Sequence, residues 1–178
     1  MKVRIIIAGS GGQGIMLLGK VLAEAVMRED KHVTWLPSYG AEVRGGTAHC
    51  MLVVSDQEIG SPYVDKADAL IIMNAPSVEK FKPRIKKNGL WVINSSLARP
   101  GEIRIRGGCV LRHPFTGLAV ELGNIKVANM LALGCFIAQS KIVNLKTVSG
   151  VIRDFAPAGK PELARVNQLA LEKGAGLR

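Results

Sequence analysis

The sequence predicts an α/β three-layer sandwich, in which an open, mostly parallel sheet lies between helices and the C-terminal third of the chain is helical. Strand-like and helix-like segments alternate, which is typical of this class. Aliphatic residues are abundant while aromatic residues make up only 4% of the chain, a balance that suits buried parallel strands. The 178 residues contain no linker or internal repeat, so we expect one domain over residues 1–178.

Each predicted element follows from a local pattern. Short aliphatic or β-branched runs predict strands, and apolar residues at helical spacing predict helices. Asn88-Gly89 predicts a turn before one of the strands. The predicted strands cover 3–8, 32–36, 47–55, 69–73 and 90–94, with one or two more within 103–112, and the predicted helices cover 14–28, 77–87, 116–122, 126–140, 146–155 and 161–173.

The net charge of +10 is concentrated in the second part of the chain. Residues 1–60 carry six basic and six acidic residues, and residues 61–178 carry eighteen and eight. The densest cluster is Lys80, Lys82, Arg84, Lys86 and Lys87. A basic surface indicates an acidic partner, although a solvated helix end explains this one cluster equally well. Nucleic acid is not expected as a partner, because the chain lacks a recognisable reading motif and has few aromatic residues for stacking, two Trp, two Tyr and four Phe.

Cysteine usage and the lack of targeting signals predict a cytoplasmic protein. No run of about eighteen apolar residues exists to span a membrane, and the N-terminus lacks the features of a secretory signal. The chain has an odd number of cysteines, and they lie in apolar segments: Cys50, Cys109 and Cys135. We therefore expect buried free thiols in a reducing compartment.

The sharpest local feature is the glycine loop, residues 9–14, between the first strand and the first helix. Its spaced glycines resemble the dinucleotide-binding pattern of a Rossmann-like sheet, in which the helix N-terminus receives an anion. The candidate binding residues here are Gly11, Gly12, Gln13 and Gly14. A dinucleotide site also needs an acid after the second strand, and residues 37–39 provide none. A tight turn without a ligand is the structural alternative.

A phosphate-loop interpretation fails on one position. Residues 14–21 have the glycine and lysine spacing of a Walker A motif, but Val21 replaces the hydroxyl that would hold Mg²⁺. The intervening residues form an apolar helical stripe. We therefore place Lys20 on a helix surface and expect no nucleotide hydrolysis.

A second polar loop, residues 38–47, follows the second strand, where open α/β sheets bind ligands. Its length and its polar groups favour a binding role. Glu42 is expected to position Arg44, although a surface Glu–Arg pair is the simpler alternative. The candidate binding residues are Tyr39, Glu42, Arg44, Gly45 and Gly46.

The two loops together resemble the gamma subunit of 2-oxoacid:ferredoxin oxidoreductases. The resemblance covers essentially the whole chain and includes the spacing between the loops and residues 69–74 and 129–134. The second loop is most similar to the 2-oxoglutarate branch, 2-oxoglutarate synthase.

This resemblance implies a chain that binds no cofactor alone and is inactive without its partners. Thiamine diphosphate, Mg²⁺ and iron–sulfur clusters would belong to alpha and beta chains and, where present, a ferredoxin-like delta chain. Coenzyme A would be a co-substrate, and ferredoxin the electron acceptor. Three scattered cysteines agree with this division, because a cluster needs four thiolates. The alternative is a free-standing NAD(P)- or FAD-binding oxidoreductase domain.

Overall fold

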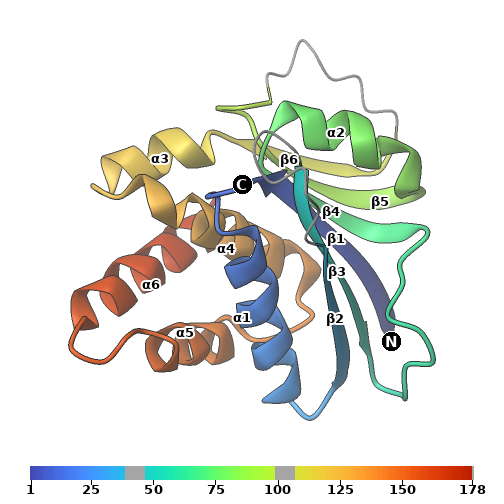
Figure 1. Ribbon diagram of the computed structural model, residues 1–178, viewed down its shortest axis with the longest axis horizontal. Helices are drawn as coiled ribbons and strands as arrows, with labels where there is room; N and C mark the ends of the chain where they lie inside the picture. The colour runs from blue at the N-terminus through green and yellow to red at the C-terminus, as the bar shows by residue number, and fades with distance from the viewer. Residues whose placement is uncertain (39–46, 99–106, 178) are drawn as a thin grey trace.

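Six strands form one sheet in the computed structural model, which describes residues 1–38, 47–98 and 107–177. The strands are β1 Lys2–Ser10, β2 His32–Ser38, β3 Thr47–Ser55, β4 Ala67–Ile72, β5 Ile85–Asn94 and β6 Cys109–His113. Their order across the sheet is β2-β3-β1-β4-β5-β6 (Figure 1).

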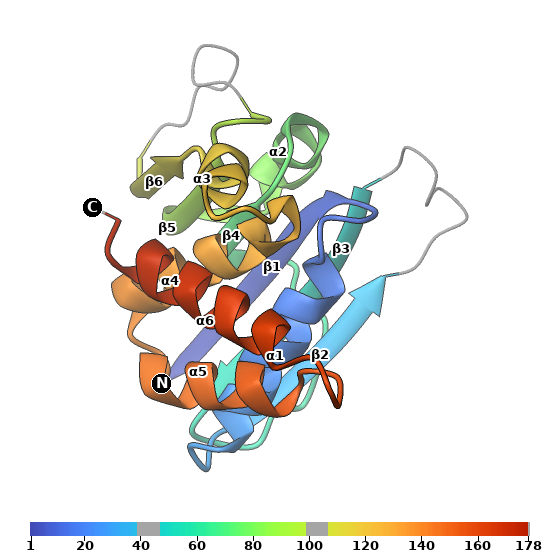
Figure 2. The same ribbon diagram turned by 90° about the vertical axis from the view of Figure 1, so that its left-hand side faces the viewer.

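Helices cover both faces of this sheet. They are α1 Ile15–Met27, α2 Ala75–Phe81, η2 Lys82–Arg84, α3 Phe115–Glu121, η4 Ile125–Val127, α4 Ala128–Ser140, α5 Leu145–Asp154 and α6 Pro161–Ala175. Helices α1, α4, α5 and α6 gather on one side, and α2 lies on the other (Figures 1 and 2). No helix in the described part of the chain is both long and apolar enough to cross a membrane.

The two hydrophobic cores follow from the alternation of side chains along the strands. Ile5 and Ile7 belong to the core beneath α1 and α4, whereas Ile6 and Ala8 belong to the core beneath α2. All four are fully buried. The predicted three-layer arrangement is therefore confirmed.

The sheet is mostly parallel, with one exception. β4 pairs in parallel with β1 and β5, and β5 with β6, but β3 runs antiparallel to both β1 and β2. The register places Ser10 opposite Thr47, and Ser38 opposite His49. The ends of β1 and β2 and the start of β3 therefore lie together at one edge of the sheet, meaning the side formed by strand ends and not an outer strand.

Most predicted elements match the structure, and β3 matches at both ends. The turn predicted at Asn88-Gly89 is wrong, because both residues lie inside β5. Pairing with β4 jumps there from Ala67–Ile85 to Ala69–Leu90. Between these two pairs the chain advances by five residues in β5 but by only two in β4. Asn88-Gly89 therefore lies in an irregularity within the strand and not in a turn before it.

The cysteines differ in their exposure. Cys50 and Cys135 are buried free thiols as expected, and burial raises their pKa to about 12 and about 11. Cys109 is also free but exposed, so the prediction of burial is wrong for this residue. It begins β6, which among the described strands is the last of the sheet and pairs with β5 alone.

Helix α4 lies between the sheet and α6, and two glycines allow close backbone contact there. A Cβ atom on Gly134 would overlap the Leu171 carbonyl of α6, and one on Gly174 would overlap the Leu131 carbonyl of α4. The two positions are reciprocal. The α4–α6 distance is therefore set by the absence of side chains at both.

We expect Gly134→Ala to cost about 1–3 kcal/mol through overpacking and to regain about 1 kcal/mol through helix propensity. The net result should be a loss of up to about 2 kcal/mol in the free energy of unfolding. Urea unfolding measures it. The control is Gly150→Ala on α5, where an added Cβ has no neighbour within 4 Å, and we expect no loss of stability. A Gly134→Ala protein as stable as Gly150→Ala would contradict this view of the α4–α6 contact.

Glu29 holds the start of α5 against the end of α1. Its Oε1 accepts hydrogen bonds from the Asn144 backbone N–H at 2.7 Å, the Asn144 Nδ2 at 3.0 Å and the Thr147 Oγ1 at 2.8 Å. The Lys31 Nζ lies 3.2 Å from Oε2. Burial raises the pKa of Glu29, but these bonds outweigh it and the net pKa is lowered.

A lowered folded-state pKa means that the carboxylate stabilises the fold above the unfolded pKa of about 4.3. This contribution is lost as the pH falls through the folded-state pKa. We expect Glu29→Gln to cost about 1–3 kcal/mol at about pH 7, and the difference from wild type to shrink at about pH 3. Urea unfolding at both pH values tests this. Glu121→Gln is the control, because its bond to Lys173 is exposed and should contribute little. A Glu29→Gln deficit that is independent of pH would refute this role.

Candidate functional site

The glycine loop joins β1 to α1 with two glycines in left-handed conformations. Gly12 has φ +86°, and Gly14, the N-cap of α1, has φ +69°. A Cβ atom on Gly14 would also overlap the side-chain amide of Asn129. That amide donates to the Gly14 carbonyl at 3.1 Å. The glycines therefore serve the turn and its close contact with α4, while the first N–H groups of α1 lack intrahelical acceptors.

Gln13, a predicted binding residue, uses its side chain within the chain. Its Oε1 accepts from the Ser10 backbone N–H at 2.6 Å, and its Nε2 donates to the Met73 carbonyl at 3.1 Å. These bonds join the end of β1 to the residue that follows β4. The Gln13 amide thus shapes the loop, and a ligand would meet the loop mainly through its backbone.

Two buried asparagines hold the neighbouring strand ends together. Asn74 donates to the Ser10 Oγ at 2.5 Å. Asn94 donates to the Met73 carbonyl at 3.3 Å and to the Thr116 Oγ1 at 2.8 Å. Buried amides are costly unless they are hydrogen-bonded, so these bonds fix the ends of β1, β4 and β5 relative to one another. This edge of the sheet is preorganised.

A cleft of about 210 Å³ opens at this edge, between the glycine loop and the segment before α4. Gly12 and Gln13 line one side, and Leu97, Ile125 and Lys126 are among the residues on the others. The walls are mostly apolar, and Lys126 adds a cation. None of the described residues that line the cleft is acidic. The cleft therefore suits an anionic group attached to a less polar body.

Lys126 was not predicted as a site residue. Its segment matched the start of a predicted helix, but the structure has a short 3-10 turn there, η4. The Asn124 side chain accepts from the Lys126 backbone N–H at 3.0 Å and caps this turn. An Asn two residues before Lys126 is the sequence signal that could have indicated a separate turn.

Tyr39, Glu42, Arg44, Gly45 and Gly46 lie outside the described residues. The residues that flank their segment, Ser38 and Thr47, belong to the edge that carries the glycine loop, because Thr47 pairs with Ser10. The antiparallel direction of β3 brings the flanks of both loops to this edge. The roles of the five residues remain predictions.

A hydrogen bond connects α2 to Thr47, the last residue of the second loop. The Lys80 Nζ donates to the Thr47 Oγ1 at 2.9 Å. Two residues further on, the His49 ring lies 4.9 Å from the Phe81 ring. Burial lowers the pKa of His49, and Lys80 and Arg84 lower it further, so this histidine is neutral near pH 7. Among the described residues, no group of three His, Cys, Asp or Glu could hold a metal ion.

The remaining sequence candidates occupy structural positions. Lys20 is exposed on α1, with its Nζ 5.4 Å from the centre of the Phe155 ring, in agreement with a helix-surface position. Glu29, just after the end of α1, binds Asn144 and Thr147 at the start of α5. The described part of the chain thus supplies no acid to complete a dinucleotide site.

Comparison with known proteins identifies the family. The family model described as pyruvate ferredoxin/flavodoxin oxidoreductase matches residues 4–177. The 2-oxoglutarate synthase subunit KorC of Methanocaldococcus jannaschii is 32% identical over 176 residues, which cover 98% of this chain and 92% of that protein. The ketoisovalerate oxidoreductase subunit VorA of Methanothermobacter thermautotrophicus is 35% identical over 177 residues and 98% of this chain.

The chain spans 36% of the length of that VorA protein, so similar domains also occur within longer chains. Among solved structures, the 2-oxoglutarate:ferredoxin oxidoreductase of Magnetococcus marinus superposes with a TM-score of 0.84 and 26% identity. That likeness covers 98% of this chain and 30% of the other. The match of the family model to nearly every residue shows that this chain belongs to the pyruvate ferredoxin/flavodoxin oxidoreductase family.

Proposed function

We propose that this chain is the gamma subunit of a thiamine-diphosphate-dependent 2-oxoacid:ferredoxin oxidoreductase that acts on 2-oxoglutarate. The complex would convert the 2-oxoacid and coenzyme A to the acyl-CoA and reduce ferredoxin. Family membership supports the reaction class. The second-loop sequence and the near full-length similarity to a 2-oxoglutarate synthase subunit support the substrate.

The redox cofactors of such a reaction do not fit this chain. Three cysteines cannot supply the four thiolates of an iron–sulfur cluster, and the two buried ones have raised pKa values. We therefore assign clusters, thiamine diphosphate and Mg²⁺ to alpha, beta and, where present, delta chains. Thiamine diphosphate supplies the electron sink for decarboxylation. The contribution of this chain is structural and ligand-positioning.

The cleft beside the glycine loop is the observation that supports a role in binding coenzyme A. The N-terminus of α1 contributes about half a positive charge, and Lys126 contributes a full one at the cleft. Leu97 and Ile125 offer apolar walls. Coenzyme A combines phosphates with a long, less polar arm. The solved Magnetococcus marinus relative has coenzyme A bound, which is consistent with this assignment.

Arg44 would complete the cationic environment from the second loop, with Glu42 as its positioning partner. A free-standing NAD(P) or FAD enzyme has less support, because the cleft lacks an acid among its described lining residues. The same geometry could hold a carboxylate of a partner chain. Kinetics with coenzyme A distinguish the two.

We expect Arg44→Ala and Lys126→Ala, each in the assembled complex, to raise the KM for coenzyme A by about ten- to hundredfold. This corresponds to about 1.5–3 kcal/mol for a charged hydrogen bond. Steady-state kinetics measure the effect, after size exclusion has shown that each complex is intact. Lys20→Ala is the control, because Lys20 lies over Phe155 and away from the cleft. If neither Arg44→Ala nor Lys126→Ala alters the KM, the cleft does not bind coenzyme A.

We also expect the isolated chain to be folded but inactive, because its sequence lacks cluster ligands and an acid–base constellation for the reaction. Co-expression with alpha and beta chains should give one complex with activity toward 2-oxoglutarate. Reduction of ferredoxin or a dye is the assay, with pyruvate and 2-oxoisovalerate as competing substrates. Turnover by the isolated chain would refute the subunit role, and a higher kcat/KM for another 2-oxoacid would refute the substrate assignment.

A further inference from the structure

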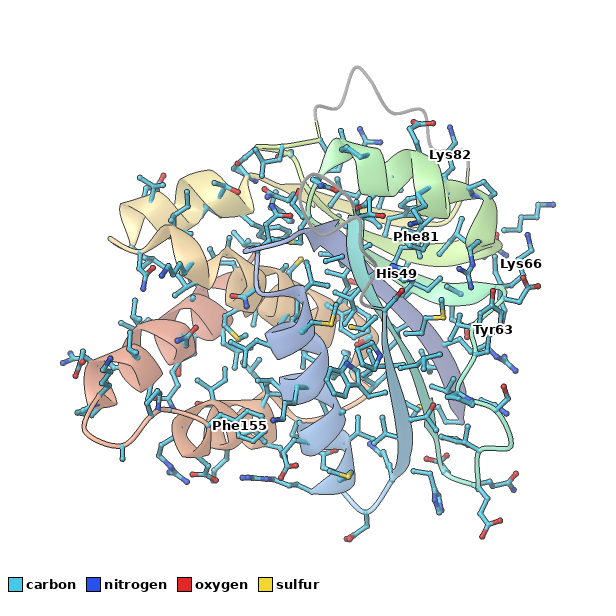
Figure 3. All side chains as sticks on the ribbon, viewed as in Figure 1. His49, Tyr63, Lys66, Phe81, Lys82 and Phe155 are labelled. Carbon is cyan, nitrogen blue, oxygen red and sulfur yellow. The ribbon has the colours of Figure 1, made fainter. Side chains whose placement is uncertain are left out.

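A patch of cations surrounds an exposed tyrosine on the side of the molecule that carries α2. We define the Tyr63 patch as Tyr63, Lys66, Lys80, Lys82 and Arg84. Figure 3 shows Tyr63, Lys66 and Lys82 along one side, with Phe155 on the opposite, helical side. The patch joins the β3–β4 connection to the end of α2 and to η2. It lies outside the cleft proposed for coenzyme A.

Arg84 fixes the centre of this patch. Its guanidinium lies 5.2 Å from the centre of the Tyr63 ring and 5.9 Å from that of Phe81. It donates to the carbonyls of Val64 and Asp65, which precede β4. Phe81 is fully buried, whereas Tyr63 is 57% exposed. The tyrosine is therefore presented to solvent by a stacked and hydrogen-bonded arginine, not by a loose loop.

Neutral acceptors hold two of the three lysines of the patch, Lys66 and Lys80. The Lys66 Nζ donates to the Pro83 carbonyl at 2.7 Å, and the Lys80 Nζ donates to the Thr47 hydroxyl. These bonds orient both ammonium groups, and within the described part of the chain neither of them forms an ion pair. The ion pairs found among the described residues involve other cations, namely the N-terminus, Arg28, Lys31, Lys86, Arg153 and Lys173.

The patch keeps a net positive charge after its own acids are counted. Residues 63–66 and 79–84, which carry the patch, also contain Asp65 and Glu79, so these two stretches hold four cations and two carboxylates, a net charge of +2. Tyr and Arg are enriched at protein interfaces. Oriented cations around an exposed ring are complementary to a surface rich in carboxylates. One exposed ring offers little stacking for single-stranded nucleic acid.

We infer that the Tyr63 patch docks a carboxylate-rich surface of a partner subunit in the complex proposed above, an inference that rests on that proposed function. The Lys80–Thr47 bond joins the patch to the edge that carries both loops. A partner seated on the patch therefore reaches the flank of the second loop.

The test reverses charge at two exposed positions, in Lys66→Glu/Lys82→Glu. The control, Lys146→Glu/Lys160→Glu, makes the same charge change at exposed lysines on α5 and before α6, in the opposite helical layer. The Kd between this chain and the co-expressed alpha–beta subcomplex is measured at about 0.05 M and about 0.5 M NaCl. Screening is much stronger at the higher salt concentration.

We expect the patch variant to raise the Kd at least about tenfold at low salt and by much less at high salt, because the lost attraction is electrostatic. The control should stay within about twofold. Lys66→Gln/Lys82→Gln removes charge with little change in size, and a smaller, still salt-dependent increase of about threefold is expected. This second variant keeps the test decisive if the reversed-charge chain fails to fold.

The outcomes separate this inference from the proposed function. If wild type assembles and both patch variants bind with its Kd, the inference is overturned while the subunit role stands. If wild type does not assemble, the proposed function fails first. Duplex DNA and phosphatidylserine vesicles are probed in parallel. Loss of binding to either one in the patch variants, with an unchanged subunit Kd, would also overturn the inference.

Discussion

The double-sided burial of β1 is the constraint on which the rest of the structure depends. Ile5, Ile6, Ile7 and Ala8 are fully buried, so helices must cover both faces of the strand and other strands must pair with both of its edges. The chain leaves this environment by a tight turn at the sheet edge. The glycine loop provides that turn, and it therefore places the start of α1, whose first N–H groups lack intrahelical acceptors, at the centre of the edge.

Local pattern predicted most of the elements but not the contacts between them. Residues 47–55 were predicted as a strand from their apolar run, yet the antiparallel direction of β3 depends on pairing with β1 and β2, which local periodicity does not encode. The same limit applies to the site. Spaced glycines predicted the loop, but Gln13 bonds the carbonyl of Met73, sixty residues away, and Lys126 reaches the cleft only through the turn before α4.

Charge shows the same dependence on tertiary contacts. The sequence presents Lys80 to Lys87 as one basic cluster, but the structure divides it. Lys86 forms an ion pair with Asp68, whereas Lys80 is held by a hydroxyl and Arg84 by carbonyls. A cation in an ion pair contributes little electrostatic potential beyond its partner. A cation bonded to a neutral acceptor keeps its positive potential. The part of this cluster that keeps its positive field is thus the part whose hydrogen-bond acceptors are uncharged.

The two surfaces assigned to binding are fixed from opposite faces of the sheet. The cleft depends on the helical layer, because Asn129 of α4 bonds the Gly14 carbonyl and Gly134, further along α4, sets the contact with α6. The Tyr63 patch depends on the other layer, where Arg84 stacks between Tyr63 and Phe81. Packing changes in one layer should leave the other surface intact. Thr47 is the residue at which they meet, since it pairs with Ser10 beside the glycine loop and accepts from Lys80. A partner that displaces Lys80 from Thr47 would therefore affect the sheet edge beside the glycine loop through β3, without a change in either hydrophobic core.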